Sequence, residues 1–508
     1  MTGERRVLVI GSGPAAAAAA LTLLEHHVPV IMLESGLPID HGLVVRALGR
    51  NLYRRWPTIQ PGYDFTVSGD QSTRWLSALA PGGLSNLWTG AVPRFAPDDF
   101  REGQRLHERY RWPITYEDLA PYYTRMERLL GVVGERRGFP QLPAPEAVEE
   151  HPLARPWRQV ARHAEAFGQG MVRVPLADGP RWMVRRSGHA FNSFQGIVRT
   201  LRRFPDFQPR FGAHVVQLHW NPQTSRVDSV IYVDRSTGET RQIEGAAVVV
   251  AAGPLASTKL LLQSTSSDFT EGMGNRHGVL GCFLHDHPNE WSVLELDSPL
   301  PVLDHNVYLT RLPYTELPPL MGASVIFCAI SKSDRLLSLT PRTTRRFGVL
   351  TFSTTTPTQE TRVRLHPERK DEFGFPVLDI RMQFGPEVRS TLQATYARLQ
   401  AILEAAGYHC TLTRQEEDLF PGYSAHYGGT VRMHESPAYG VLNAWSRLHD
   451  VPNVVVADAS AFTTGVEKNP TLTVMALSAR AADRLADDLM RDNMTSTRGS
   501  SRALPAFR

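Results

Sequence analysis

Three short segments near the end of the chain carry the side chains best suited to chemistry. The first, HYGGTVRM, sets His426 beside a turn of small residues where the backbone can approach a flat ring closely. The second is an apolar run that ends on Asp458, and the third is an N-P-T sequence that begins at Asn469. Proline suits the first position of a helix, and a helix start presents free N–H groups and partial positive charge to an anion. A base, an acid at a strand end and a positive helix end together suit a flavin active site.

Oxidation of an alcohol would explain the need for such a base. A hydride leaves the carbon only as the hydroxyl loses its proton, so a base must lie within hydrogen-bonding reach of that hydroxyl while the flavin stacks on the other side. Histidine has an intrinsic pKa suited to this task, and we predict that His426 is the base. Asn469 is the second candidate active-site residue, expected to orient the hydroxyl, and a helix cap is its alternative role.

The three segments resemble the C-terminal signature of the glucose-methanol-choline (GMC) oxidoreductase family. That signature has a histidine before a G-T-x-R-M turn, a V-x-D-A-S strand end and an N-P-T helix start. The resemblance implies an enzyme that holds FAD, with His426 facing the reactive ring and Asp458 holding the ribityl and pyrophosphate part. A helix or turn cap is the alternative for Asp458. The other candidate cofactor contacts in these segments are Ala459, Pro470 and Thr471.

A glycine fingerprint near the start of the chain, VLVIGSGPAAAAAALTLLEHHVPVIMLES, is typical of a dinucleotide-binding turn. Gly11 makes the tight turn and Gly13 lets the backbone reach a pyrophosphate, while Ala16 allows close packing of the helix on the sheet. Glu34 follows at the position of the acid that binds ribose hydroxyls. Chance glycines in an ordinary α/β turn are the alternative. The fingerprint predicts a strand over residues 7–10, a helix over 14–25 that opens on Pro14, and a strand over 28–33.

The fingerprint alone does not distinguish FAD from NAD. A second buried strand over residues 247–252 runs into Gly253 and a helix, which looks like the second contact of a flavoprotein's nucleotide domain. An NAD dehydrogenase would need neither this segment nor Asp458. We therefore predict FAD as the cofactor, with Val216 as a further candidate contact.

The segment PGGLSNLWTGAVPRFAPDDF, residues 81–100, adds a glycine pair and polar side chains. It is similar to the G-G-x-S-x-x-W-T-x-A-x-P-R-F segment of the pyranose 2-oxidase branch of the family, which lies along the flavin. In that branch a histidine just before the tryptophan carries a covalent bond to FAD. Leu87 stands there in this chain, so the resemblance implies FAD held non-covalently. A surface turn is the alternative for the glycines, and the candidate contacts are Gly82, Gly83, Ser85, Asn86 and Trp88.

The segment GNRHGVLGCFLHDHP, residues 274–288, also resembles a family segment, and the resemblance makes it a connection that covers the cofactor. A metal site at His285-Asp286-His287 is the alternative. Ligands at i and i+2 without a second cluster rarely close a coordination sphere, so we predict no metal. The three cysteines lie far apart with no paired spacing, which agrees with a reducing compartment.

Two kinds of pattern indicate two domains in this 508-residue chain, which exceeds what one hydrophobic core usually supports. Residues 361–367 and 377–384 alternate apolar and polar side chains, as half-buried antiparallel strands do, and an amphipathic helix over 388–406 follows them. We predict an α/β fold (α+β overall), a Rossmann-like FAD-binding domain with an inserted substrate domain of antiparallel sheet and helix. The FAD-binding domain takes residues 1–100, 205–289 and 420–490, the substrate-binding domain takes 101–204 and 290–419, and 491–508 form a disordered tail.

Composition excludes several other classes of protein. Hydrophobic residues make up 42% and charged residues 21% of the chain, as in globular proteins and unlike disordered or collagen-like ones. The net charge is +4 and the basic residues are scattered, which argues against nucleic acid as a partner. Arg5-Arg6 before an apolar stretch resembles a twin-arginine export signal, but cleavage after that stretch would remove the glycine fingerprint. No apolar run reaches the roughly 18 residues of a membrane span, so we expect a cytoplasmic enzyme.

These observations predict an FAD-dependent oxidoreductase that oxidises a hydroxyl of a sugar or sugar-like polyol. The substrate preference rests on the resemblance of residues 82–95 and of the His426 segment to the pyranose-oxidising branch. Dioxygen or a quinone-type acceptor is expected to remove the electrons, and the sequence does not predict the oligomeric state. A hydroxynitrile lyase-like member or an enzyme acting on a non-sugar alcohol is the first alternative. An NAD-dependent dehydrogenase, a flavin monooxygenase and a silent binding protein are the others, although no second glycine fingerprint supports a nicotinamide site.

Overall fold

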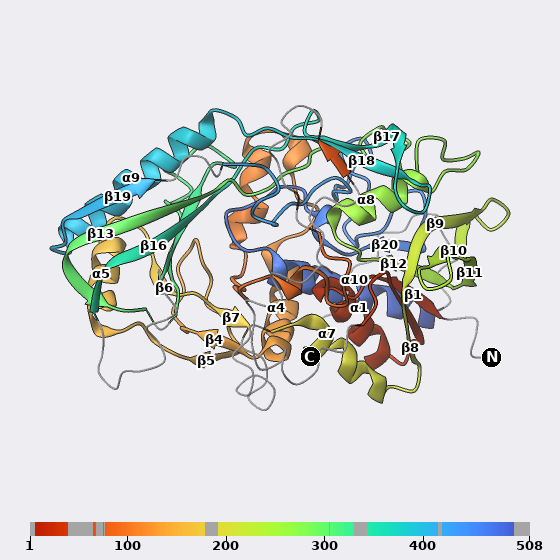
Figure 1. Cartoon of the computed structure of the whole chain (residues 1–508), viewed down its shortest axis with the longest axis horizontal. Helices are drawn as coiled ribbons and strands as arrows, with labels where there is room; N and C mark the ends of the chain where they lie inside the picture. Colours follow the sequence, from red (N-terminus) through yellow and green to blue (C-terminus); the bar gives the residue numbers. More distant parts are fainter. Residues whose placement is uncertain are drawn as a thin grey trace.

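The structure, a computed structural model, arranges the described residues around two large sheets (Figure 1). A parallel sheet lies at the right of Figure 1, near the N-terminus, and an antiparallel sheet lies at the left. The predicted disordered tail lies outside the described residues except for Arg491. The described residues are 6–38, 65–67, 75, 77–177, 191–303, 305–329, 343–414 and 419–491.

Five parallel strands form the first sheet, in the order β20-β12-β1-β2-β8. β1 (Val7–Ile10) lies at its centre, between β12 (Ala247–Val250) and β2 (Val30–Glu34). These strands are short apolar runs rich in β-branched residues, and they are buried along their whole length, as strands covered on both faces must be. β20 (Val454–Val456) and β8 (Phe207–Phe211) complete the sheet. The predicted α/β fold is confirmed.

Helices α1 (Pro14–Glu25) and α10 (Thr471–Met490) pack against each other beside this sheet. α1 has the bounds predicted from the sequence. Its run of six alanines, residues 15–20, is buried, and the Ser478 hydroxyl of α10 donates a hydrogen bond of 2.7 Å to the carbonyl oxygen of Ala15. Pro470 directly precedes α10, so the prediction that it would occupy the first helical position is wrong by one residue.

A second helix and a small sheet flank the parallel sheet. α8 (Pro254–Gln263) follows β12 through Gly253, whose φ of +90° is a conformation that other residues rarely adopt. Nearby, β9 (Ala213–Asn221), β10 (Arg226–Asp234) and β11 (Thr240–Glu244) form an antiparallel meander. β9 contacts α8, so this meander braces the helix from the side.

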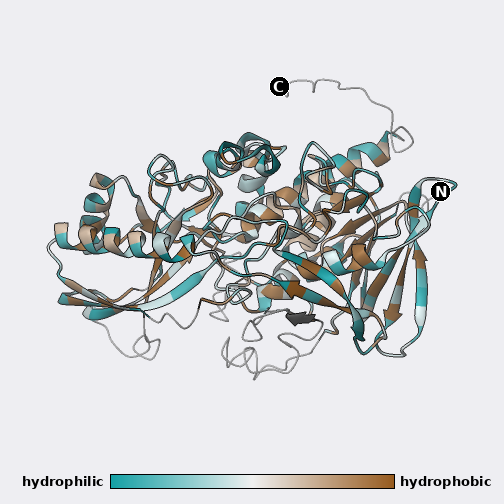
Figure 2. Cartoon of the chain, turned by 90° about the horizontal axis from the view of Figure 1, so that it is seen from above, coloured by the Kyte–Doolittle hydropathy of each residue, from teal (hydrophilic) through white to brown (hydrophobic). Residues whose placement is uncertain are grey.

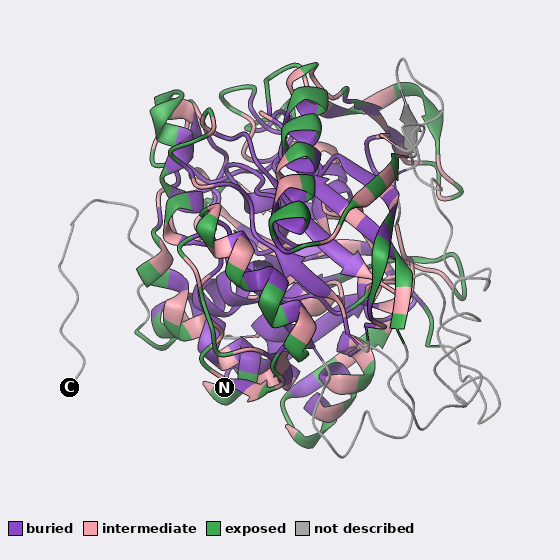
Figure 3. Ribbon diagram, turned by 90° about the vertical axis from the view of Figure 1, so that its left-hand side faces the viewer, coloured by how far each residue is buried: buried purple, intermediate pink, exposed green. Residues whose placement is uncertain are grey.

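Six strands form the second large sheet, in the order β19-β13-β16-β15-β14-β6, and all its pairs are antiparallel. α5 (Arg155–Ala166) and α9 (Glu387–Ala405) pack on it, and their apolar faces share one core with the strands. Figure 3 shows the buried strands behind helices whose outer faces are exposed. The predicted combination of antiparallel sheet and helix is confirmed. The strands are β6 (Met171–Arg173), β13 (Asn289–Pro301), β14 (Val307–Leu309), β15 (Ala323–Cys328), β16 (Thr343–Ser353) and β19 (Cys410–Arg414).

The two strands predicted from alternating side chains form a separate small sheet. β17 (Arg362–Lys370) pairs antiparallel with β18 (Pro376–Arg381), which pairs in parallel with β3 (Phe65–Val67). Val363 and Ile380 are buried on one face, as the alternation predicted. This face packs on α8, so the sheet lies beside the nucleotide-type fold and not in the six-stranded sheet.

The segment between β2 and β8 in the chain contributes elements to both halves of the molecule. α4 (Tyr116–Leu130) packs on α10, whereas β6 joins the six-stranded sheet. The remaining elements are β4 (Val132–Gly134), β5 (Val148–Glu150), β7 (Leu176–Ala177), α7 (Ser193–Gly196), and the 3₁₀ turns η1 (Gly83–Asn86), η2 (Pro97–Phe100), η3 (Glu102–Arg105), η4 (Glu108–Tyr110), η5 (Val198–Arg203) and η8 (Ala459–Ala461).

Hydrophobic strands run through the middle of both halves, and hydrophilic residues gather on the outer turns and helix faces (Figure 2). Within the described ranges, no helix combines the length and the apolar character that crossing a membrane requires.

Candidate active site

A cavity of about 640 Å³ opens where the strands of the parallel sheet end. Three of the predicted strand ends meet there: the turn after β1, the turn after β12, and Asp458 after β20. Carboxyl ends of parallel strands are the usual ligand site of such sheets. The structure brings most predicted site residues to this cavity: Gly11, Gly13, Pro14, Glu34, Gly83, Ser85, Trp88, Gly253, His426, Asp458, Ala459, Asn469, Pro470 and Thr471.

Four predicted cofactor contacts lie outside the cavity wall. Ala16 is buried inside α1, where it packs against its neighbours. Val216 points into the core from β9, and the preceding residues of that strand line the cavity in its place. Gly82 and Asn86 hold the η1 turn together: the Gly82 carbonyl accepts a hydrogen bond of 2.6 Å from Ser85, and the Asn86 amide donates to the carbonyls of Pro81 and Gly83. These two residues therefore hold the η1 turn in place and do not themselves line the cavity.

The two glycines of the fingerprint have different surroundings. Gly11 has a φ of +105°, and a Cβ added there would lie 2.5 Å from the carbonyl oxygen of Ala251. A Cβ added at Gly13 would meet no atom within 4 Å, because this glycine faces the open cavity at the start of α1. Gly11 is thus required by the fold, whereas Gly13 keeps space free for a ligand.

Glu34 lies at the end of β2 with both carboxylate oxygens occupied. The Ser12 hydroxyl donates to one oxygen at 2.5 Å, and the Gly36 amide donates to the other at 2.6 Å. Ser12 in turn accepts a hydrogen bond of 2.9 Å from the Gly82 amide, which ties η1 to the fingerprint turn. Burial raises the pKa of Glu34 to about 7, although both hydrogen bonds oppose this rise. The carboxyl can therefore change its charge near neutral pH.

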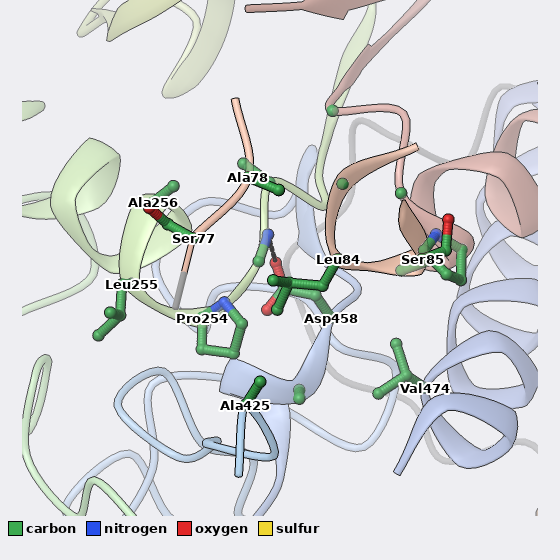
Figure 4. Close-up of a pocket in the computed structure, with 18 of the residues that line it drawn as sticks. Ser77, Ala78, Leu84, Ser85, Pro254, Leu255, Ala256, Ala425, Asp458 and Val474 are labelled. Carbon is green, nitrogen blue, oxygen red and sulfur yellow. Dashed lines mark hydrogen bonds between the residues drawn. The ribbon is translucent and has the colours of Figure 1, made fainter. Parts of the chain in front are cut away.

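Asp458 connects two turns at the centre of the cavity. One of its oxygens accepts from the Gly253 amide at 3.0 Å and from the Ser257 hydroxyl at 2.5 Å, and the other accepts from the amide and hydroxyl of Ser460. Figure 4 shows this carboxylate between Pro254 and Leu84. Asp458 therefore caps η8, which was its alternative role, while it also lines the cavity.

His426 lies at the far end of the cavity, in a web of hydrogen bonds. Its Nε2 is 3.1 Å from the Nδ2 of Asn469, and its Nδ1 is 3.1 Å from the Nδ1 of His287. The carboxylate of Asp286 accepts from the His426 amide at 3.2 Å and also from Ser424. Asn469 thus contacts the histidine through its side chain and does not cap α10.

The partners of the two histidines assign the position of each ring proton. A hydrogen bond from the His287 ring to the backbone of Val466 favours protonation of His287 on the nitrogen that faces Val466. Since Nδ1 of His287 faces His426, we assign that proton to Nε2 and leave Nδ1 as the acceptor. His426 must then donate from its own Nδ1, so its Nε2 carries the lone pair. Asn469 can donate its amide proton to that lone pair.

Burial also keeps both rings uncharged. It lowers the pKa of His426 to about 4, and it lowers the pKa of His287 well below the usual range, with the neighbouring histidines adding to this effect. At neutral pH His426 is therefore neutral, and its unprotonated Nε2 is directed at Asn469 and the cavity. Such a nitrogen can accept a proton from a hydroxyl group.

A fully buried charge cluster lies directly before Asn469. Lys468 is 2.8 Å from both Asp99 and Glu467, and Arg311 is 3.0 Å from Glu102 and 3.5 Å from Glu467. Three carboxylates face two cations, and burial raises the pKa of Glu102 to about 7, so this cluster tends to retain one proton. The sequence did not reveal this cluster, because its members come from three distant segments.

The sequence analysis predicts no metal site at residues 285–287, and the structure gives each of these side chains a different neighbour. His285 is packed against the backbone of Gly428 and Gly429, Asp286 holds the His426 loop, and His287 contacts His426. Within the described residues no group of three histidine, cysteine or acidic side chains is arranged to hold a metal ion. The sequence approach missed His287 as a neighbour of His426, although its alternation with His285 was a usable signal.

Further residues of the cavity wall come from the six-stranded sheet, namely Asn289, Leu350 and Phe352. Asn289 opens β13 and Phe352 lies near the end of β16, directly opposite it across the strand pair. The Phe352 ring centroid is 5.1 Å from that of His426. Neither Asn289 nor Phe352 carried a sequence motif, since each lies in an ordinary strand pattern.

The parallel sheet and its cavity are the architecture of an α/β ligand-binding protein, and comparison with known proteins indicates an oxidoreductase. Residues 357–478 match the family model for GMC oxidoreductases. The chain is 27% identical to 2-methyl-1,2-propanediol dehydrogenase of Mycolicibacterium austroafricanum over 94% of this chain and 95% of that protein. It is 28% identical to paromamine 6'-oxidase of Streptomyces fradiae over 95% of this chain and 92% of that protein. These matches agree with the predicted resemblance to the GMC oxidoreductase family, and the prediction that the chain is an oxidoreductase is confirmed.

A solved structure shares the fold. The FAD-dependent oxidoreductase of Chaetomium thermophilum superimposes with a TM-score of 0.67, at 14% identity, over 96% of this chain and 100% of that chain.

Proposed function

We propose that the chain binds FAD in the cavity and oxidises a hydroxyl group of a sugar-like alcohol, with His426 as the general base. The observation that carries this proposal is the pair His426 and Asn469, whose facing nitrogens are 3.1 Å apart at the cavity wall. The tautomer assigned above leaves the lone pair on the nitrogen nearest Asn469. A hydroxyl group placed there would meet a proton acceptor and an amide together.

The residues of the cavity fit FAD. The space in front of Gly13 and Gly253 is open, since a Cβ at either position would meet no atom within 4 Å. Glu34 lies at the end of the second strand, where it can accept hydrogen bonds from ribose hydroxyls. The start of α10 supplies free N–H groups and partial positive charge. When bound, FAD would supply the acceptor for the hydride.

The protein's own part in the reaction is the handling of one proton. His426 would accept the proton of the substrate hydroxyl on Nε2 while Asn469 holds the oxygen. The resulting imidazolium would still donate through Nδ1 to the neutral ring of His287, so part of its charge is stabilised at 3.1 Å. The carbon that loses its hydride becomes a carbonyl.

The proposed substrate class rests on the names of two relatives and on one sequence motif. The names of the two relatives above indicate 2-methyl-1,2-propanediol, which has two neighbouring hydroxyl groups, and paromamine. The likeness of residues 82–95 to the pyranose 2-oxidase branch also favours a sugar ring. Dioxygen or a quinone-type acceptor would take up the electrons afterwards. A non-redox lyase on the same fold is the second candidate, because it would use the same base.

Anaerobic mixing with alcohols tests the proposal. The holoenzyme is mixed without oxygen with a panel of pyranosides, small diols, aryl alcohols, choline and sterols, and the flavin absorbance near its visible maximum is followed. We expect bleaching by at least one pyranoside or diol. Bleaching only by aryl alcohols, choline or sterols would remove the sugar-like class, and an oxidised flavin with every compound would favour the lyase.

We predict that the flavin is released when the protein is denatured. Leu87 stands where the covalent attachment would be made, and its side chain offers no nucleophile. After acid precipitation the yellow colour should remain in the supernatant, where its absorbance and mass identify FAD. Flavin that stays with the precipitated chain would contradict this prediction.

We predict that FAD affinity depends on pH through Glu34. Without a ligand its pKa is about 7, so near pH 6 the carboxyl is mostly protonated. Ribose hydroxyls that donate to it favour the charged form, so binding releases a proton and affinity rises from pH 6 to pH 8, by up to about tenfold per unit below the pKa. Titration of the FAD-free protein, followed by flavin fluorescence, measures the effect.

The matched variant for this titration is Glu34→Gln, which keeps the size of the side chain and cannot titrate. It should bind FAD more weakly than the parent at pH 8 and with nearly equal affinity at both pH values. A parent protein with equal affinity at pH 6 and pH 8, or a glutamine variant that keeps the parental slope, would show that Glu34 does not face the ribose.

A further inference from the structure

Asn289 is a buried polar residue of the cavity wall for which the mechanism above has no role. Its side chain is 7% exposed, and its Oδ1 has no hydrogen-bond partner among the described residues. Buried amide oxygens are nearly always paired, because an unpaired one loses its hydrogen bonds to water without replacement. Since Asn289 lines the cavity, a ligand in the cavity can supply the missing donor.

The neighbours of Asn289 place it close to His426. Asn289 and Phe352 are directly opposite each other on β13 and β16, and paired side chains of an antiparallel sheet lie about 5 Å apart on the same face. The Phe352 ring is in turn 5.1 Å from the His426 ring, measured between centroids. The amide and the imidazole therefore both lie next to Phe352 in the wall of the same cavity.

The side chains around Asn289 indicate which kind of donor group pairs with its amide oxygen. Leu350 and Phe352 present apolar surface that suits the C–H groups of a carbon skeleton. The acidic residues among the described cavity wall are Glu34 and Asp458, whose carboxylate oxygens already accept hydrogen bonds from the turns around them. An ammonium group would lack a carboxylate beside Asn289, whereas a hydroxyl group needs only the neutral amide oxygen. A hydroxyl is therefore the better match.

We infer that Asn289 binds a second hydroxyl group of the substrate, on a carbon near the one that is oxidised. The enzyme would thus select alcohols with neighbouring hydroxyl groups over simple alcohols of the same shape. This inference rests on the proposed function, because it takes His426 as the position of the reacting hydroxyl. It makes Asn289 a specificity-determining residue.

The test uses three compounds on one ring: trans-cyclohexane-1,2-diol, cyclohexanol and trans-2-aminocyclohexanol. The holoenzyme and its Asn289→Leu variant are mixed anaerobically with each compound, and the second-order rate constant of flavin reduction is measured. The parent should prefer the diol over cyclohexanol by at least about tenfold, since an amide left unpaired by the wrong substrate penalises its binding. In Asn289→Leu this preference should fall to within about twofold. Binding of each compound is also measured by calorimetry in the His426→Ala background, which needs no turnover.

Leu350→Val is the matched control, because it alters the apolar wall on the paired strand β16 and should change the rates with diol and cyclohexanol by the same factor. If Asn289→Leu fails to retain FAD, Asn289→Ala replaces it. The inference is overturned if the parent shows no preference, if the variant keeps it, or if the amino alcohol is preferred to the diol. If no compound reduces the flavin, the proposed oxidation fails for these alcohols, and tighter binding of the diol that depends on Asn289 would still support the inference. Equal or absent binding would overturn it.

Discussion

Replacement of His426 by alanine should slow anaerobic flavin reduction at least about 100-fold while FAD stays bound, which is the usual scale for loss of a positioned general base. The ring is half-buried, neutral and held between Asn469 and His287 at the cavity wall, so its loss removes the proton acceptor from that position. Stopped-flow measurement of the reduction rate at saturating alcohol gives the effect. Asn469→Ala should cost less, because it removes orientation and leaves the proton acceptor.

The pH dependence of the parent enzyme adds a second readout. Because the pKa of His426 is lowered to about 4, the ring is unprotonated and active at neutral pH, and the reduction rate should fall only as the pH drops toward 4. The control is His277→Ala, which removes an exposed histidine and should reduce flavin at the parental rate. A His426→Ala enzyme as fast as the parent would contradict the assignment of the base.

Replacement of Gly13 by valine should abolish FAD retention and leave the fold intact. A Cβ there meets no protein atom within 4 Å, so we expect the folded chain to accommodate valine, but this side chain would occupy the space where a pyrophosphate must approach the backbone. Purified Gly13→Val protein should be colourless and should match the FAD-free parent in thermal unfolding. Absorbance of flavin per chain after gel filtration is the measurement.

Gly11→Ala is the contrasting variant two residues away. Its Cβ would lie 2.5 Å from a backbone carbonyl oxygen, at a φ of +105°, so it should destabilise the fold by at least about 2 kcal/mol. The two glycines of one motif should therefore fail in different assays, one in cofactor binding and the other in stability. Full flavin content in Gly13→Val would show that the nucleotide binds elsewhere.

Much of the nucleotide-type fold could be predicted, because short segments of the sequence specify its strands and helices. β1 and α1 have the predicted bounds, since a short β-branched run, two glycines and a proline leave few conformations for the segment. The candidate site residues at strand ends were predicted for the same reason. Most of them line one cavity, because parallel strands end at one edge.

The other half of the site could not be predicted, because it depends on long-range pairing. Asn289 and Phe352 are 63 positions apart, and only the register of β13 on β16 sets them side by side at the cavity. The sequence did not show whether Asn86 faces a ligand or its own turn, since the hydrogen bonds to neighbouring carbonyls decide this. His287 likewise acquires its role from His426, which lies on a separate loop.

The charge cluster before Asn469 limits how this protein can be re-engineered. Its five members come from the 3₁₀ turns near residue 100, from the loop after β14 of the antiparallel sheet, and from the segment that leads into α10. Arg311 follows β14 of the antiparallel sheet. A chimera that takes this sheet from another enzyme can therefore lose Arg311 while the other four members of the cluster remain. Loss of one partner leaves a buried charge uncompensated, at a cost of about 3 to 5 kcal/mol. Grafted sheets should therefore be chosen, or redesigned, so that all five side chains of the cluster are kept together.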